Sequence, residues 1–160
     1  MRTPTVATYE IRVVLKAPLP YAFRWCTDYR PDDGGRAHER YQRRILTRTQ
    51  GRIVYEDLED SPSGWIWKHT EVTLLPPNRW RAHSVGNRRE FRLNYRLRAL
   101  GTARTELTLR GRRRGTVLGG PNPPRARLER ELRTLWRHLG DALAREYRRE
   151  HPARRGQQRR

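Results

Sequence analysis

The stretch VVLKAPLPYAFRWCTDY, residues 13–29, changes its hydrophobic spacing part-way along. Apolar and polar side chains alternate over residues 9–16, and this period of two predicts a half-buried β-strand. Pro18 and Pro20 then suit the first turn of a helix, and the apolar residues that follow recur at helical spacing. We therefore expect a strand that leads directly into a short helix over residues 19–28.

Turn residues dominate the segment that follows. The sequence RPDDGG, residues 30–35, breaks the helix, and a further helical turn is expected near residues 36–40. The acidic residues of this segment are typical of turns and helix caps. Residues 41–114 then form a series of short apolar and β-branched runs divided by glycine, proline and asparagine, which predicts an antiparallel meander. The expected strands span residues 41–49, 52–60, 65–75, 79–85, 88–100 and 102–114.

A long helix is expected at the end of the domain. It follows the rigid segment GGPNPP, residues 119–124, and spans residues 125–150. Leucines recur along it every three or four residues, with Trp136 beside them, so one apolar stripe faces a core. At about 1.5 Å per residue the helix reaches roughly 39 Å, which is enough to cross a sheet. Pro152 follows its end.

The composition fits one strongly basic domain. Lysine and arginine together number 36, against 17 aspartate and glutamate residues, so the formal net charge is +19. Such a charge attracts polyanions, such as RNA, DNA or acidic membrane surfaces, although the codon usage of a GC-rich genome would also favour arginine over lysine. The chain of 160 residues divides into a loose lead-in at 1–7, one domain at 8–150 and a basic, disordered tail at 151–160.

Several protein classes are excluded by the sequence. It has no apolar run of about 18 residues, and its beginning, MRTPTVATYEIR, has no apolar core of a signal peptide, so a cytoplasmic protein is expected. Cys26 is the only cysteine, which excludes an intrachain disulfide and a cysteine-based zinc site. No catalytic triad, phosphate-binding loop or pair of catalytic carboxylates stands out. We expect no metal and no cofactor.

The order of these elements resembles the helix-grip fold of the SRPBCC superfamily, which includes START lipid-transfer domains, polyketide cyclases and the birch-pollen allergen family. The resemblance covers residues 8–150 and is carried by residues 13–29, the strand series 41–114 and the helical segment 126–147. It implies an α+β fold: a seven-stranded curved antiparallel sheet wraps around the long C-terminal helix, with one or two short helices after the first strand. It also implies a cavity for a hydrophobic or amphipathic small molecule. Because the superfamily has no universal catalytic motif, the catalytic residues stay unknown, and any activity would be cyclase-like or dehydratase-like.

Hairpin pairing predicts which side chains face this cavity. A two-residue turn at residues 86–87 would pair Trp80 with Leu93, and a turn at residues 101–103 would pair Tyr95 with Leu109. The same logic carried backward would pair Leu74 with Trp80 and Ile66 with Leu58. A β-bulge would invert the assignment beyond it. On this assignment the apolar inner face carries Trp80, Ala82, Phe91, Leu93, Tyr95, Leu97, Leu107 and Leu109.

The inner face also receives a charged group, made of Arg43, Glu56 and Lys68. Buried charges are costly unless they are paired, and a cavity with a few convergent polar groups is the usual form of a ligand site. The group therefore either binds the polar end of a ligand or forms a cross-strand ion pair at a wet sheet edge. The candidate ligand-binding residues are Tyr41, Arg43, Glu56, Lys68, Thr70, Trp80, Ser84, Phe91, Tyr95 and Trp136.

The outer face combines aromatic side chains with arginines. This pattern is typical of a stacking platform for single-stranded nucleic acid, and it also suits a homodimer interface. The candidate nucleic-acid residues are Tyr55, Trp65, Trp67, Arg92, Arg96 and Arg98. We expect a protein that binds a lipid or polyketide-like small molecule, and the alternative is an RNA- or ribosome-associated protein that uses this face and the tail.

Overall fold

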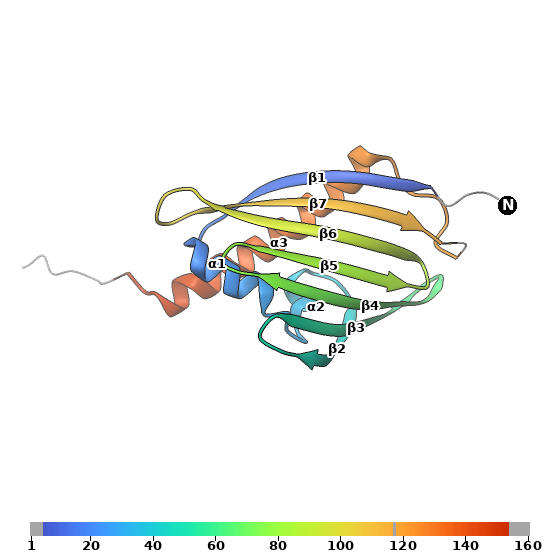
Figure 1. Cartoon of the computed structure of the whole chain (residues 1–160), viewed down its shortest axis with the longest axis horizontal. Helices are drawn as coiled ribbons and strands as arrows, with labels where there is room; N and C mark the ends of the chain where they lie inside the picture. Colours follow the sequence, from blue (N-terminus) through green and yellow to red (C-terminus); the bar gives the residue numbers. More distant parts are fainter. Residues whose placement is uncertain (1–4, 117, 154–160) are drawn as a thin grey trace, which may run out of the picture.

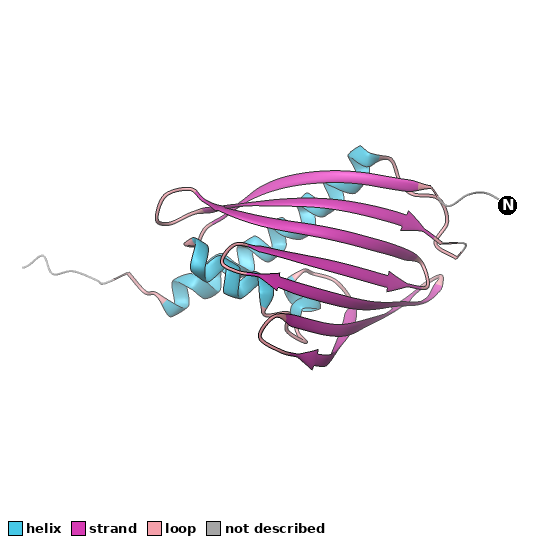
Figure 2. Ribbon diagram, viewed as in Figure 1, coloured by secondary structure: helices cyan, strands magenta, loops and turns pink. Residues whose placement is uncertain are grey.

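The computed structural model describes residues 5–116 and 118–153. In this part of the chain, one face of a curved, seven-stranded antiparallel sheet carries three helices (Figures 1 and 2). The strands are β1 (Val6–Leu15), β2 (Tyr41–Arg48), β3 (Arg52–Ser61), β4 (Gly64–Leu75), β5 (Arg79–Gly86), β6 (Arg89–Ala99) and β7 (Thr105–Gly115). The helices are α1 (Leu19–Thr27), α2 (Asp33–Arg36) and α3 (Arg125–Glu150).

The strand order is β1-β7-β6-β5-β4-β3-β2, so the meander from β2 to β7 is completed by β1 beside β7. This confirms the predicted α+β architecture. The predicted lead-in at residues 1–7 falls partly outside the described residues, and β1 begins at Val6. Most of the predicted tail at 151–160 also lies outside them. Among residues 5–116 and 118–153, no helix is long and apolar enough to cross a membrane.

Helix α2 begins earlier than the helical turn predicted near residues 36–40. Its main chain leaves the helical conformation at His38, which has a positive φ of 57°. The amide N–H of Glu39 bonds back to the carbonyl oxygen of Gly34 at 2.8 Å and closes this turn. The chain then enters β2 at Tyr41.

The apolar stripe of α3 faces the sheet, as predicted. Leu128, Trp136 and Leu143 are buried, and α3 runs obliquely behind the strands in Figure 1. The helix comes close to β1 at Gly140, where an added Cβ would lie 3.4 Å from a methyl group of Leu15. Full burial of a leucine side chain contributes about 1.5–3 kcal/mol to the free energy of unfolding.

Two predicted strand registers are confirmed. In a third the register shifts, but the side chains stay on their predicted faces. Leu74 pairs with Trp80 across β4 and β5, and the β6–β7 hairpin has the predicted register throughout. The connection between β5 and β6 is residues 87–88 instead of the predicted 86–87, so Trp80 pairs with Tyr95 instead of Leu93. A shift of two residues leaves every side chain on its predicted face.

The β3–β4 register differs from the prediction by one residue, and this exchanges the two faces of β3. Ser61 pairs with Gly64, which has a φ of 103°, so Glu59 rather than Leu58 lies opposite Ile66. The prediction that Glu56 points inward is therefore wrong. Tyr55, predicted on the outer face, is a buried inner residue.

A second irregularity keeps β2 in its predicted orientation. The pairing of β2 with β3 shifts between Ile45 and Thr47, which marks a β-bulge. Arg43 consequently lies opposite Asp57, and both face inward. The bulge and the β3–β4 shift offset each other for Tyr41 and Arg43.

Candidate ligand cavity

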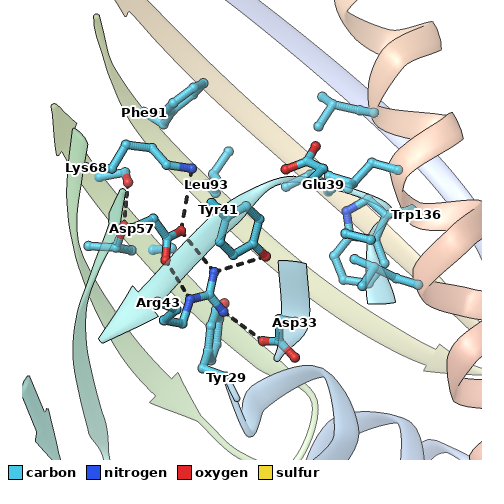
Figure 3. Close-up of a pocket in the computed structure, with 18 of the residues that line it drawn as sticks. Tyr29, Asp33, Glu39, Tyr41, Arg43, Asp57, Lys68, Phe91, Leu93 and Trp136 are labelled. Atoms are coloured by element: carbon cyan, nitrogen blue, oxygen red, sulfur yellow. Dashed lines mark hydrogen bonds and ion pairs between the residues drawn. The ribbon is translucent and has the colours of Figure 1, made fainter. Parts of the chain in front are cut away.

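A cavity of about 580 Å³ lies between the inner face of the sheet and α3. Leu132, Leu135 and Leu139 of α3 form one wall, and the sheet forms the other. The loop from Ala37 to Arg40 lines the cavity at its α2–β2 side. Figure 3 shows Glu39 of this loop and Trp136 of α3 among the residues that line the cavity. The cavity therefore exists because α3 packs on β1 and stands away from the central strands.

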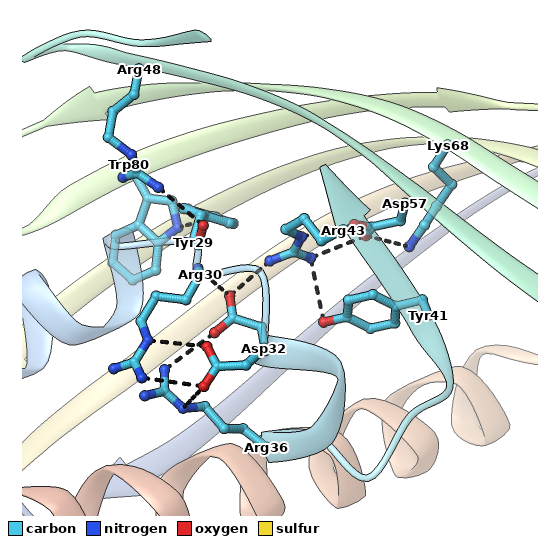
Figure 4. Close-up of polar contacts among 11 residues, drawn as sticks. Tyr29, Arg30, Asp32, Arg36, Tyr41, Arg43, Arg48, Asp57, Lys68 and Trp80 are labelled. Atoms are coloured by element: carbon cyan, nitrogen blue, oxygen red, sulfur yellow. Dashed lines mark hydrogen bonds and ion pairs between the residues drawn. The ribbon is translucent and has the colours of Figure 1, made fainter. Parts of the chain in front are cut away.

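Arg43 holds together the polar side of the cavity (Figures 3 and 4). Its Nε and Nη2 donate to the two carboxylate oxygens of Asp57 at 2.8 and 3.0 Å. Its Nη1 donates to Asp33 at 2.7 Å, and Nη2 also donates to the Tyr41 hydroxyl at 3.3 Å. The guanidinium carbon lies 4.0 Å from the ring centroid of Tyr55. Two carboxylates and an aromatic face thus satisfy this buried cation.

For Arg43, these contacts favour an ion pair over direct binding of a ligand. The Arg43 and Asp57 side chains are only 6% and 2% exposed, so neither is free to bind a ligand. Lys68 is different, because its ammonium lies 3.7 Å from Asp57 and its side chain is 31% exposed. Lys68 and the Tyr41 hydroxyl are therefore the polar groups that this cluster offers to the cavity.

The floor of the cavity combines a polar pair with stacked aromatic rings. Thr70 and Ser84 share a hydrogen bond of 2.5 Å across β4 and β5. The Tyr95 ring stacks on Trp80 with centroids 4.6 Å apart, and it meets the edge of Trp136 at 5.9 Å. Trp80 lies behind Tyr95 and does not line the cavity, contrary to its inclusion among the ligand-binding candidates. Of the other candidates, the following do line it: Tyr41, Arg43, Lys68, Thr70, Ser84, Phe91, Tyr95 and Trp136.

The phenol groups around the cavity are neutral at physiological pH. Burial raises the pKa of Tyr55 to about 12, although the nearby charge of Arg43 opposes the rise. Burial likewise raises the pKa of Tyr9 to about 12. The pKa values of Tyr29 and Tyr95 are raised well above the usual tyrosine value for the same reason. These side chains can therefore donate a hydrogen bond but do not supply a negative charge.

Helix α2 is tied to α3 through Arg36, which also contacts Asp33. Arg36 forms an ion pair with Glu146 at 2.7 Å and another with Asp33 at 3.3 Å. The indole N–H of Trp25 donates to the same Glu146 carboxylate at 2.8 Å. Asp33 therefore does more than cap a turn, because it links this network to Arg43. Sequence reasoning missed this role, since no spacing relates residues 33, 43 and 146.

Two further arginines face inward that were not predicted to do so. Arg89 of β6 and Arg113 of β7 line the other end of the cavity beside Phe91. The alternation of β7 indicates this position, because Arg113 lies four residues after the inner residue Leu109. The predicted inner face ended at Leu109, four residues before this position.

The outer face retains only part of the predicted nucleic-acid surface. Trp65 and Trp67 are exposed, at 59% and 39%, whereas Tyr55 is buried inside. Arg92 and Arg98 form ion pairs with Glu90 and Glu106, at 3.6 and 3.1 Å. Arg96, the remaining candidate, is exposed on β6. Within residues 5–116 and 118–153, no group of three or more side chains is placed to hold a metal ion.

Solved structures share this arrangement at low sequence identity. The ZhuI aromatase/cyclase from Streptomyces sp. R1128 matches with a TM-score of 0.68 and 17% identity, over 92% of this chain and 98% of that one. The chain has the helix-grip fold. A START superfamily protein from Mycobacterium smegmatis matches this helix-grip domain with a TM-score of 0.63 and 14% identity, over 89% of this chain and 98% of that one. Ara h 8.0201 matches with a TM-score of 0.65 and 9% identity, over 87% and 98% of the two chains. No protein-family model and no curated protein sequence matches the chain.

Proposed function

We propose that this helix-grip domain binds a hydrophobic or amphipathic small molecule, of lipid or polyketide-like type, between the sheet and α3. The observation that carries the proposal is the cavity of about 580 Å³, which lies within the range of about 300–1,000 Å³ typical of ligand pockets. Its leucine wall and aromatic floor offer apolar contact, and Lys68 and Tyr41 offer polar groups at one side. Burial of the ligand's apolar surface supplies the binding free energy.

The similar structures support the same class of ligand. One carries the name aromatase/cyclase and another belongs to the START superfamily. Any catalysis would depend on positioning a reactive chain in the cavity.

Native mass spectrometry of the protein purified from its host tests the proposal. We expect a bound mass of lipid or polyketide size that is lost on extraction with organic solvent. The variant L132W places an indole in the cavity, and we expect it to carry no such mass while remaining folded. The matched control V85W adds the same ring on the outer face, where Val85 is 45% exposed, and we expect it to keep the mass.

Two outcomes would contradict ligand binding. One is the absence of any co-purifying mass together with no binding of added dodecanoate, dodecanol or a polycyclic phenol. The other is equal retention of a mass in L132W and in the unsubstituted protein, because the ligand would then lie outside the cavity.

We propose RNA or another polyanion as a partner only as the second candidate, on the basis of the exposed Trp65 and Trp67 and the arginines of the outer face. The expected result is binding to generic RNA with an affinity that falls steeply as salt is raised. W65A/W67A should weaken that binding, because base stacking contributes about 1–3 kcal/mol per base. No binding at low salt would contradict it.

A homodimer through the same face and a cytoplasmic location also stay predictions, for which light scattering and cell fractionation are the measurements.

A further inference from the structure

The inner face of the sheet brings two arginines together at the end of the cavity away from Arg43. Phe91 pairs with Arg113 across β6 and β7, and Arg89 lies two residues before Phe91 on the same face. The guanidinium carbons of Arg89 and Arg113 lie 5.7 and 5.8 Å from the centroid of the Phe91 ring. Both side chains line the cavity. Two positive charges therefore share one aromatic ring at the edge of an apolar space.

Neither arginine forms an ion pair among residues 5–116 and 118–153, in contrast to Arg43, and the Nε of Arg113 is buried without a hydrogen-bond partner. The charges of Glu39 and Glu131 act on Arg89 and Arg113 only from beyond ion-pair distance. Burial, together with the charge of Arg89, lowers the pKa of Arg113 to about 10, so the group is still a cation at neutral pH. Glu131 also lines this end of the cavity, but its carboxylate is bound to Arg127 at 2.8 Å.

The residue next to Arg113 on the inner face of β7 is a glycine, Gly111, that the Tyr9 ring covers. A Cβ at Gly111 would overlap the Tyr9 ring, so the absence of a side chain lets the ring lie against the sheet. The Tyr9 hydroxyl remains protonated and lines the same part of the cavity.

We propose that Arg89 and Arg113 bind a terminal oxyanion of the ligand, a carboxylate or a phosphate, while its apolar body extends along Leu93 towards Trp136. The proposal rests on the proposed function, because it assigns the polar end of the same ligand. A guanidinium presents several N–H donors to an oxyanion, and an unpartnered, partly buried donor is costly to leave unbound. The ligand class is therefore an amphiphile with one acidic end.

Calorimetric titration with three amphiphiles of equal chain length tests this assignment. The probes are dodecanoate, dodecyl phosphate and dodecanol, and we expect at least one of the two anions to bind about tenfold more tightly than the alcohol. A preference for dodecanoate over dodecyl phosphate, or the reverse, identifies the oxyanion. The variants R89Q and R113Q should each lose about tenfold for the preferred anion and remain within about twofold for dodecanol. R112Q, which removes the same charge on the outer face of β7, should behave like the unsubstituted protein.

Thermal unfolding of the ligand-free variants separates a binding role from a structural one. R113Q should unfold at the same temperature as the unsubstituted protein or higher, because it removes an uncompensated buried charge. A large fall in that temperature would give Arg113 a structural role and overturn the proposal. Equal losses for dodecanoate and dodecanol in R89Q and R113Q would also overturn it, as would a preference of the unsubstituted protein for dodecanol. Failure of all three probes to bind would instead contradict the proposed function itself.

Discussion

The guanidinium of Arg43 donates two hydrogen bonds, of 2.8 and 3.0 Å, to the carboxylate of Asp57 on the adjacent strand, and solvent barely reaches either side chain. Because Asp33 adds a further contact from α2, this cluster joins the β2–β3 edge of the sheet to the helical side of the cavity. Its role is structural, and that role has a measurable consequence.

Replacement of Arg43 by methionine should destabilise the domain strongly. Asp57 would lose both of its short hydrogen bonds to a cation and keep only Lys68, at 3.7 Å. Asp33 would keep only Arg36 as a cationic partner, and breaking a buried pair in this way costs about 3–5 kcal/mol. The measurement is the free energy of unfolding in urea at neutral pH. R44M is the matched control, because the side chain of Arg44 is 77% exposed and its ion pair with Glu56 is long, at 3.8 Å. A loss below about 1 kcal/mol for R43M would contradict the buried ion pair.

Thr70 and Ser84 should behave as a coupled pair. The variant S84A or T70V leaves one buried hydroxyl or acceptor without its partner, and each should lower the free energy of unfolding by about 1–3 kcal/mol. The double variant T70V/S84A removes both polar groups, so its loss should be smaller than the sum of the two. Strict additivity in this double-mutant cycle would show that the 2.5 Å hydrogen bond does not contribute.

Asp28 should make the stability of the domain depend on pH. Burial raises the pKa of this carboxyl from 3.8 to about 7, and the charge of Asp33 adds to the effect. The carboxyl therefore ionises at a lower pH in the unfolded chain than in the folded one. As the pH rises from about 4 to 7, the free energy of unfolding falls. Below this range both states are protonated, and above it both are ionised.

The variant D28N removes this penalty. Its free energy of unfolding should exceed that of the unsubstituted protein above about pH 7, and the difference should shrink towards zero near pH 4. D60N changes an exposed carboxylate on β3 and should give no such trend. A difference between D28N and the unsubstituted protein that is constant with pH would contradict the raised pKa.

Gly111 should tolerate no side chain. An alanine Cβ would overlap the Tyr9 ring, and overpacking of this kind costs about 1–3 kcal/mol. G51A is the control, since no atom lies within 4 Å of a Cβ built at Gly51 in the β2–β3 turn. Chemical denaturation of the two variants compares them directly. Equal stability of G111A and G51A would mean that the Tyr9 ring moves away without cost.

The order of elements and most of the core were predictable because local signals agree with the global fold. Alternation in β6 and β7 placed Leu97 and Leu107 in the core, and both are fully buried. The faces of β3 were not predictable, because pairing across the Ser61–Gly64 turn differs by one residue from the assumed register.

The polar part of the candidate site was harder to predict than its apolar part. Glu56 and Asp57 are adjacent acids, and only the register decides which one meets Arg43. The contacts of Arg43 with Asp33 and of Arg36 with Glu146 join segments far apart in the chain, so no spacing in the sequence indicates them. Arg113 could have been placed inside by extending the alternation of β7, but the absence of an ion pair to it among the described residues emerges only from the packed structure.

The chain contains 36 basic residues, and only Lys16 and Lys68 among them are lysines. Lys16 is exposed after β1, whereas Lys68 lines the cavity beside Asp57. Reagents that acylate amines and spare guanidinium groups therefore find one lysine side chain outside the cavity and one within it. A bound molecule would shield Lys68 from acylation while Lys16 continues to react as an internal standard. The scarcity of lysine thus makes the interior of this domain chemically addressable by mass-spectrometric footprinting, with no label engineered into the chain.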